Sequence, residues 1–370
     1  MSVSLAEELN RHGIHADILS MYPEDIPGVA EEKESLLQTG IPAVHFLGSR
    51  RTSITAVVSA IIRLRRLILE QEYNIVETSL IGPAILAAWA TLGTQARLVT
   101  GLHQVFRLDQ QNSGRHKFLR FSVRCNRRIR YYAISDMVAE CWFRYSRTPI
   151  GHTRRIYNGI PGIYFSPAPD RRGVRAELGL PMDARLALYV GRLAASKGID
   201  TILNALSPIL EKENLFLLYI GLPDLHYNGT EEMLQQMERR IAEHAWGARV
   251  RFLGFRIDVP RLMASADVLV HPTRTEGFGL SLIEAMAAGL PVVASDAEAI
   301  PEILAGSESA MVPMDDPLAL RKAVLEILHW SPTEVDKAVE SGRKRAEEFR
   351  MEKRIDSMIR LFEDVLAGQF

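Results

Sequence analysis

The chain has 370 residues, of which 47% are hydrophobic and 24% are charged, so it predicts a globular protein with more than one hydrophobic core. A formal net charge of −1 excludes a nucleic-acid binder that works through overall charge. The two cysteines, Cys125 and Cys141, lack the spacing of a zinc site or a disulfide framework, and the longest apolar run, 80–92, is too short to span a bilayer, so we expect a cytoplasmic protein.

The first half of the chain alternates helical and extended segments. In chain order we expect a helix over 3–9, a strand over 15–21, a helix over 56–70, a strand over 75–77, a helix over 83–92, a strand over 97–100, a helix over 116–128 and a strand over 130–134. Such alternation predicts a parallel sheet covered by helices.

A second series follows a stretch rich in proline and glycine, 158–169, which we interpret as a linker. Strands are expected over 185–190, 215–220, 250–253, 267–270 and 291–294, with helices over 198–210, 231–244, 259–264 and 281–288 between them and a terminal amphipathic helix over 351–366. The sequence therefore predicts an α/β protein of two doubly wound, Rossmann-like domains, with a small-molecule site in the cleft between them.

The densest chemical signal is the segment EGFGLSLIE, residues 276–284. A glycine-rich turn, 277–279, precedes a helix, and the unpaired N–H groups at a helix N-terminus favour an anion. Glu276 lies in the loop and Glu284 on the first turns of the helix, where carboxylates can accept hydrogen bonds from sugar hydroxyls. Taken singly, each glutamate also fits an exposed surface charge.

A second signal is the strand-to-turn segment YVGRLAASKG, residues 189–198. Arg192 offers a planar fork of donors and Lys197 a mobile point charge, and both suit the phosphates of a nucleotide diphosphate. The alternative is a pair of solvated loop cations. Neither the phosphate-loop pattern of NTPases nor a complete G-x-G-x-x-G pattern is present.

With these motifs the chain resembles the group 1, retaining glycosyltransferases, which have two Rossmann-like domains in the arrangement called GT-B. The resemblance rests on Gly191-Arg192 with Lys197-Gly198, Asn158-Gly159-Ile160, Leu253-Gly254-Phe255, Glu276 and Glu284 at the Glu-x7-Glu spacing, and Ile300-Pro301-Glu302. It implies an acceptor-side domain over 1–160, a donor-binding domain over 161–350, and a C-terminal helix, 351–370, that packs back on the first domain.

The resemblance also implies a role for each matching residue. Arg192 and Lys197 would bind the donor diphosphate, Glu284 the ribose hydroxyls and Glu276 the donor sugar. The remaining donor contacts would come from Gly191, from the backbone near Phe255 and Arg256, and from N–H groups around Gly277, Phe278, Gly279 and Leu280. The implied partners are a nucleotide-sugar donor and a sugar, glycan or lipid-linked acceptor, without a cofactor, a metal ion or nucleic acid.

In the first domain, His103 stands where the family places a histidine that contacts the donor sugar, although a lone histidine after a strand is usually structural. Ser135 matches a serine of the family but is better interpreted as a helix N-cap. Residues 97–155 carry thirteen basic and three acidic side chains, so the basic helix 116–128 is a candidate for peripheral contact with an anionic membrane or a lipid-linked acceptor. A solvated helix face is the alternative interpretation of this helix.

Two departures from the family pattern stand out. Glu298 and Ala299 occupy positions where the family has two glycines. The family also opens with a strand and a glycine turn, whereas this chain starts in the helix that should follow them. Because that strand lies in the centre of a doubly wound sheet, we expect a vacant position beside strand 75–77 or 16–19.

The reaction we expect is glycosyl transfer with retention of configuration. The vacancy leads us to expect nucleotide binding through the second domain with poor transfer, and it keeps open a protein that binds nucleotide sugars without turnover. Nucleotide-sugar epimerisation or phosphorolysis on the same architecture is another alternative, against which the Glu-x7-Glu spacing argues.

Overall fold

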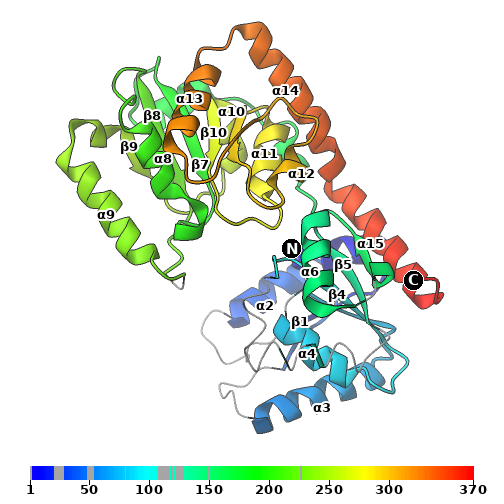
Figure 1. Ribbon diagram of the computed structural model, residues 1–370. Helices are drawn as coiled ribbons and strands as arrows, with labels where there is room; N and C mark the ends of the chain where they lie inside the picture. The colour runs from blue at the N-terminus through cyan, green and yellow to red at the C-terminus, as the bar shows by residue number, and fades with distance from the viewer. Residues whose placement is uncertain are drawn as a thin grey trace. The chain divides into compact units, whose positions relative to one another are not determined.

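The computed structural model describes residues 2–20, 29–47, 54–79, 81–106, 117, 120–121, 129–148, 150–225 and 227–370. It divides into two compact units, Met1–Tyr157 with Glu352–Phe370, and Asn158–Met351 (Figure 1). The second unit therefore begins before residue 161, the expected start. Its first and last segments are joined, because the Ile160 amide donates to the carbonyl of Phe349 (2.9 Å) and the Met351 amide donates to that of Ile160 (3.2 Å).

The second unit is built on one parallel sheet. Its strands are β7 (Arg185–Val190), β8 (Leu215–Ile220), β9 (Val250–Phe252), β10 (Val268–His271), β11 (Val292–Ser295) and β12 (Ala310–Val312). They lie in the order β12-β11-β10-β7-β8-β9 with every pair parallel. The first strand, β7, is central, as a doubly wound sheet requires, so the predicted architecture of this half is confirmed.

Helices cover both faces of this sheet (Figure 1). They are α7 (Arg171–Glu177), α8 (Ile199–Leu206), α9 (Thr230–Glu243), α10 (Val259–Ser265), α11 (Leu280–Ala288), α12 (Ile300–Leu304), α13 (Pro317–Leu328) and α14 (Pro332–Ala346). Apolar side chains of α8, α9 and α13 form one core with the strands, while α11 packs against α10 and α14. The strands read as continuous apolar runs because helices bury both of their faces.

The chain reverses direction across the sheet between β7 and β10. The strands that follow β7 in sequence, β8 and β9, add on one side of it, and β10, β11 and β12 add on the other. Neighbouring connections at such a switch point leave the sheet toward opposite faces, which opens a crevice at the carboxyl ends of the two strands. The loops 191–198 and 272–279, which carry the motif cations and the glycine turn with Glu276, directly follow these two strands.

The first unit has the same α/β character but a divided sheet. Its elements are α1 (Ser2–Arg11), β1 (Ile18–Ser20), α2 (Val29–Gln38), β2 (Val44–Phe46), α3 (Ile54–Glu70), β3 (Ile75–Thr78), α4 (Ile81–Ala90), β4 (Arg97–Leu102), β5 (Arg130–Ala133), α6 (Asp136–Ser146), β6 (Thr153–Arg155) and α15 (Met351–Leu366). The strands that the structure describes form two separate parallel sheets, β1-β2 and β3-β4-β5-β6. This division agrees with the interrupted sheet expected from the sequence.

The terminal helix α15 packs with the first unit, through a buried face that includes Ile355, Met358 and Leu361. An ion pair of 2.8 Å between Arg154 Nη1 and Asp364 Oδ2 fixes its far end. The expected basic helix 116–128 falls almost wholly outside the described residues.

Gly198 provides a test of how closely the two site loops must approach. Its φ is +64°, and an added Cβ would lie 2.0 Å from the carbonyl oxygen of Pro272. Gly179 has a similar φ of +61° with nothing within 4 Å. We expect Gly179→Ala to cost about 1 kcal/mol, for the left-handed backbone alone, and Gly198→Ala to cost at least about 2 kcal/mol more, because backbone must move. Urea denaturation of both variants measures the difference, and equal losses would contradict the close approach.

Candidate functional site

The site begins where two loops of the second unit are joined by their backbones. The loop after β7 ends in a short 3-10 turn, Ala195–Lys197, and the loop after β10 runs from Pro272 to Gly279. The Arg274 amide donates to the carbonyl of Ser196 at 2.9 Å. The structure therefore brings together the two motifs that the sequence analysis singled out.

Arg274 clamps these loops and was not expected from the sequence. Its guanidinium donates to both carboxylate oxygens of Asp200, at 2.9 Å each, and to Asp315 at 2.7 Å. It also donates to the carbonyl of Ala195. Because a bidentate pair fixes direction as well as distance, the loop that carries Glu276 is held in a defined place relative to Lys197.

Lys197 and Glu276 form an ion pair at the centre of the site. Lys197 Nζ lies 2.7 Å from Glu276 Oε2, and the two side chains are only 14% and 18% exposed. His271 Nε2 lies 3.6 Å from the same oxygen. Although burial raises the pKa of Glu276, its interactions with His271 and Lys197 hold that pKa well below the usual value, so the carboxylate stays ionised near neutral pH.

Arg192 is the second cation of the site, and its environment differs from that of Lys197. Its side chain is 68% exposed and is ion-paired with Asp224, which follows β8 and is largely buried. Exposed pairs of this kind add little stability. The guanidinium is therefore free to exchange Asp224 for another anion at small cost.

The glycine turn leads into α11 as predicted. Gly279 has φ +90° and is the N-cap of the helix, a conformation that favours glycine. The side chain of Phe278 is buried and packs edge-on against Phe349, with ring centroids 5.7 Å apart. The Phe278 amide donates to Glu276 Oε1 at 3.3 Å, so without a ligand this N–H serves the loop carboxylate.

Glu284 lies on α11, one turn into the helix, and is largely buried. Burial raises its pKa to about 7, although a hydrogen bond from the Tyr164 hydroxyl acts in the opposite direction. Tyr164 comes from the 3-10 turn Gly162–Tyr164, early in the second unit. A carboxyl with this pKa is partly protonated at neutral pH, because the hydrogen bond from Tyr164 does not offset the cost of burying its ionised form.

Glu298, which replaces a glycine of the family pattern, adopts the backbone expected of one. Its φ is +45°, a strained value for a residue with a side chain. Its carboxylate accepts a hydrogen bond of 2.7 Å from the backbone amide of Glu276. The side chain of Glu298 therefore supports the Glu276 loop at a position where the resemblance led us to expect a glycine.

The loop after β9 is expected to meet the nucleotide base. Phe255 is 72% exposed there, while the side chain of Arg256 is held by Asp258 at 2.7 Å and by Glu177 at 2.6 Å. The Arg256 guanidinium is thus committed to a structural ion network. The role assigned to the backbone of this loop stays a prediction.

His103 belongs to the first unit, directly after β4. Its Nε2 lies 3.2 Å from the hydroxyl of Tyr132. Burial, followed by the positive charge of Arg354, lowers the pKa of His103 to about 4, so the imidazole is neutral at physiological pH. Ser135 is confirmed as the N-cap of α6, because its Oγ accepts from the Val138 amide at 3.2 Å.

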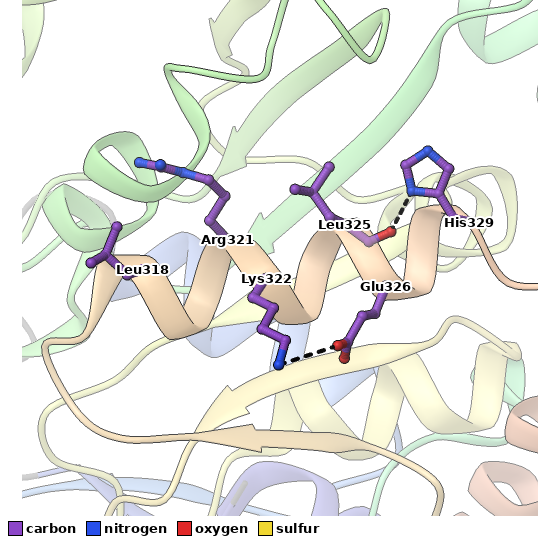
Figure 2. Close-up of a pocket in the computed structure, with 6 residues that line it drawn as sticks. All are labelled: Leu318, Arg321, Lys322, Leu325, Glu326 and His329. Atoms are coloured by element: carbon purple, nitrogen blue, oxygen red, sulfur yellow. Dashed lines mark hydrogen bonds and ion pairs between the residues drawn. The ribbon is translucent and has the colours of Figure 1, made fainter.

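A shallow pocket of about 400 Å³ lies elsewhere in the second unit, along α13. All six residues that line it come from this helix and the residue after it, as Figure 2 shows, and they are Leu318, Arg321, Lys322, Leu325, Glu326 and His329. Two of its charges already neutralise each other, since Lys322 and Glu326 are 3.8 Å apart. A groove along one helix brings no separate elements together, and we assign it no site.

Several functional side chains were missed by the sequence analysis, and they are Tyr164, Asp224, His271, Arg274, Tyr132 and Arg354. One signal was available: Arg354 stands on the apolar stripe of the terminal helix with Met358, Leu361 and Val365, where a charged residue needs a buried partner.

The fold and the joined loops define an α/β protein whose candidate site lies at the switch point of its second unit. Residues 170–345 match the family model described as glycosyl transferases group 1, and residues 2–161 match the model described as glycosyltransferase family 4. Between them these matches take in most of both units, and they support a group 1 glycosyltransferase with the GT-B fold.

Individual relatives agree with this classification. An uncharacterized glycosyltransferase of Methanocaldococcus jannaschii is 35% identical over 162 residues, which are 42% of this chain and 40% of that protein. A D-inositol 3-phosphate glycosyltransferase of Streptomyces avermitilis is 32% identical over 180 residues, 47% of this chain and 39% of that protein. The chain thus spans about two fifths of these curated relatives.

Solved structures share the fold over nearly the whole chain. HepE of Anabaena, solved in complex with UDP, superposes with a TM-score of 0.82 at 20% identity, and the match covers 98% of this chain and 95% of that one. No helix within the described residues has both the length and the apolar character to cross a membrane.

The two cations should differ in their effect on stability. Lys197→Ala leaves the carboxylate of Glu276 buried without its counter-ion, so we expect a loss of about 3 kcal/mol. Arg192→Ala removes an exposed pair and should cost less than about 1 kcal/mol. Thermal unfolding of both variants measures this, and adding Glu276→Gln to Lys197→Ala should restore most of the loss. Equal destabilisation by the two single variants would contradict the central ion pair.

Glu284 should make the free protein sensitive to pH. A carboxyl whose pKa rises from 4.5 to about 7 on folding favours the protonated folded state, so stability falls as pH rises from about 4.5 to 7. We expect Glu284→Gln to stabilise the protein by up to about 3 kcal/mol at pH 8 and hardly at all at pH 4.5. Denaturation at both pH values tests this, with the exposed Glu238→Gln as the matched control. An unchanged difference between the two pH values would rule out the raised pKa.

Proposed function

We propose that this protein transfers a sugar from a nucleotide-diphosphate-sugar donor to an acceptor, with retention of anomeric configuration. The observation that carries the proposal is the ion pair of Lys197, which lies on the same loop as Arg192, with Glu276, which directly precedes the glycine turn at the N-terminus of α11. This arrangement offers positive charge for a diphosphate and, beside it, carboxylates for the hydroxyls of a sugar.

The diphosphate is assigned to the two cations and the helix N-terminus. Phosphate oxygens would replace Glu276 at Lys197 and Asp224 at Arg192, which leaves both cations paired. The neighbouring structure of HepE binds UDP, and a second structure of that protein contains UDP-glucose, which supports a nucleotide-sugar donor. The proposal gives the task of neutralising the leaving group to these side chains rather than to a metal ion.

The hydroxyl groups of the donor are assigned to the two glutamates. Glu284, partly protonated and buried, gains hydrogen-bond donors if ribose hydroxyls reach it, and their bonds would favour its ionised form. Glu276, released from Lys197, would accept from hydroxyls of the transferred sugar. In this proposal Glu284 recognises the ribose of the donor and Glu276 recognises the transferred sugar.

The reaction breaks the bond between the anomeric carbon and the phosphate oxygen, and the electron pair of that bond leaves with the diphosphate. Positive charge develops on the sugar and negative charge on the leaving group, where Lys197 and Arg192 stabilise it. The acceptor hydroxyl attacks from the same face, and its proton passes to the departing phosphate oxygen. This route gives retention without a covalent nucleophile from the protein.

The acceptor is proposed only as a class, a sugar, glycan or lipid-linked saccharide. Residues 97–155 of the first unit carry thirteen basic and three acidic side chains, which favours an anionic acceptor or peripheral contact with anionic lipid through the basic segment 116–128. A protein that binds nucleotide sugars without turnover is less favoured, because the matched relatives are described as glycosyltransferases.

The division of roles predicts two distinct binding defects. Glu284→Ala should weaken the affinity for a nucleoside diphosphate at least about tenfold, through lost bonds to the ribose. Glu276→Ala should retain nucleotide affinity but lower donor turnover, and Lys197→Ala should lower turnover by on the order of a hundredfold. Calorimetry with nucleoside diphosphates and donor-hydrolysis assays measure these effects.

Equal losses of nucleotide affinity in the two glutamate variants would contradict this division. Tight nucleotide binding without turnover of any nucleotide sugar, even by slow hydrolysis, would overturn the assignment as a transferase and favour the binding protein.

A further inference from the structure

A chain of polar side chains crosses one face of the first unit's sheet. In β3, β4 and β5 the register pairs Glu77 with Val99 and Gly101 with Tyr132. Because alternate residues of a strand share a face, Glu77, Gly101 and Tyr132 point to the same side of the sheet. His103 continues this alternation directly after β4.

Gly101 makes room for this chain. A Cβ at this position would lie 2.4 Å from the Tyr132 hydroxyl and 2.6 Å from Nε2 of His103. The phenol can therefore cross β4 and reach Glu77 only because the middle strand carries no side chain at this position. A glycine in a strand interior weakens the strand, and here it allows a contact that joins three strands.

The hydrogen bonds around the Tyr132 hydroxyl fix the direction of its single proton. The hydroxyl donates to Glu77 Oε1 at 2.8 Å, and it also hydrogen-bonds the guanidinium of Arg354, which can only donate. Burial and the charge of Glu77 raise the pKa of Tyr132 well above its usual value, so the phenol keeps this proton. Ser79 is a further hydrogen-bonding neighbour of the phenol, but its hydroxyl donates to Glu77 Oε1 at 3.0 Å. Toward His103, at 3.2 Å, the phenol oxygen has no proton to donate and can only accept.

We propose that Tyr132, fixed by Glu77 and Arg354, is a positioning residue that holds His103 in the Nε2–H tautomer, so that Nδ1 presents a lone pair to a sugar hydroxyl. The opposite tautomer would place the Nε2 lone pair against the lone pair of the phenol oxygen. This inference rests on the proposed function for the identity of the ligand, whereas the tautomer itself depends only on the contacts within the first unit.

Burial raises the pKa of Glu77 above its usual value, whereas the hydrogen bonds from Tyr132 and Ser79 and the charge of Arg354 act in the opposite direction. The bond from Tyr132 requires only an acceptor oxygen on Glu77, which the carboxyl group offers in either protonation state. Glu77 also accepts from Ser79 Oγ at 3.0 Å, and Arg354 is a nearby buried cation. A protonated Glu77 would leave that cation without its counter-ion, which is costly in the interior. The carboxyl group of Glu77 and the guanidinium of Arg354 thus both hydrogen-bond the hydroxyl of Tyr132 and fix its position.

A neutral imidazole of fixed orientation suits the transfer reaction. An imidazolium near the sugar would oppose the positive charge that develops at the anomeric carbon, whereas a neutral Nδ1 accepts a hydrogen bond from a hydroxyl and adds electron density near that carbon. Positioning of this kind acts on orientation and tautomer, so it should lower kcat when it is lost and leave nucleotide affinity unchanged.

The test is nuclear magnetic resonance of the imidazole nitrogens in the full chain, with nitrogen-15 in the histidines. Comparison with His103→Gln identifies the signals of His103 among the ten histidines. We expect the wild-type protein at pH 7.5 to show Nε2–H with unprotonated Nδ1, and Tyr132→Phe to show a mixture of tautomers. Tyr131→Phe is the matched control, because Tyr131 points to the other face and its buried hydroxyl has no partner among the described residues.

In donor turnover, Tyr132→Phe should lower kcat about tenfold, as expected for one lost hydrogen bond, while the Kd for a nucleoside diphosphate stays the same. Tyr131→Phe should retain kcat. The proposal is overturned if wild-type His103 carries its proton on Nδ1, a measurement that needs no variant to fold, or if Tyr132→Phe changes neither tautomer nor kcat. The expected tautomer in a chain that turns over no donor would support the positioning and contradict the proposed function.

Discussion

The ion pair between Lys197 and Glu276 is the interaction on which the rest of the site depends. Both side chains are mostly buried, and a buried charge without a partner costs several kcal/mol. Lys197 and Glu276 therefore hold each other in place. In the proposed function, a diphosphate that binds Lys197 would release Glu276 for the hydroxyls of the sugar. The ion pair would thus couple recognition of the leaving group to recognition of the transferred sugar, because neither charge can stay buried without a partner.

This exchange needs loops that stay in place while their partners change. Arg274 ties the Glu276 loop to Asp200 and Asp315, and the carboxylate of Glu298 supports the Glu276 amide from the other side. Gly198 allows the backbones to approach without a side chain between them. With the loops held in this way, the proposed exchange requires only side chains to change partners, and preorganised charge of this kind is a large term in enzymatic catalysis.

Sequence reasoning identified the elements that local chemistry specifies. Short apolar runs separated by helical segments predicted the strands around β7. Glycines beside charged residues predicted the turns that carry Arg192 and Glu276. The pairing of Lys197 with Glu276 was not predictable in this way, because it joins loops from separate strands whose distance depends on the sheet order. Tyr132 reaches Glu77 only through the space at Gly101, a relation among three strands. The partners of Arg354 could not be predicted either. Its position on the apolar stripe of the terminal helix indicates that it needs a buried partner, but not which residue that partner is.

The two units carry different electrostatic environments. The second unit gathers full charges in compensated pairs, Lys197 with Glu276 and Arg192 with Asp224, which suits a ligand whose leaving group becomes more negative. The first unit buries Glu77 against Arg354 and leaves His103 neutral, which suits a sugar that becomes more positive. A positively charged His103 near the sugar would oppose the positive charge that develops there, and so would offset the stabilisation that Lys197 and Arg192 give to the leaving group. Burial of His103 is the main cause of its low pKa, and the positive charge of Arg354 on the terminal helix α15 lowers that pKa further. In the proposed reaction, α15 would therefore help to keep the imidazole neutral through a residue that touches no ligand.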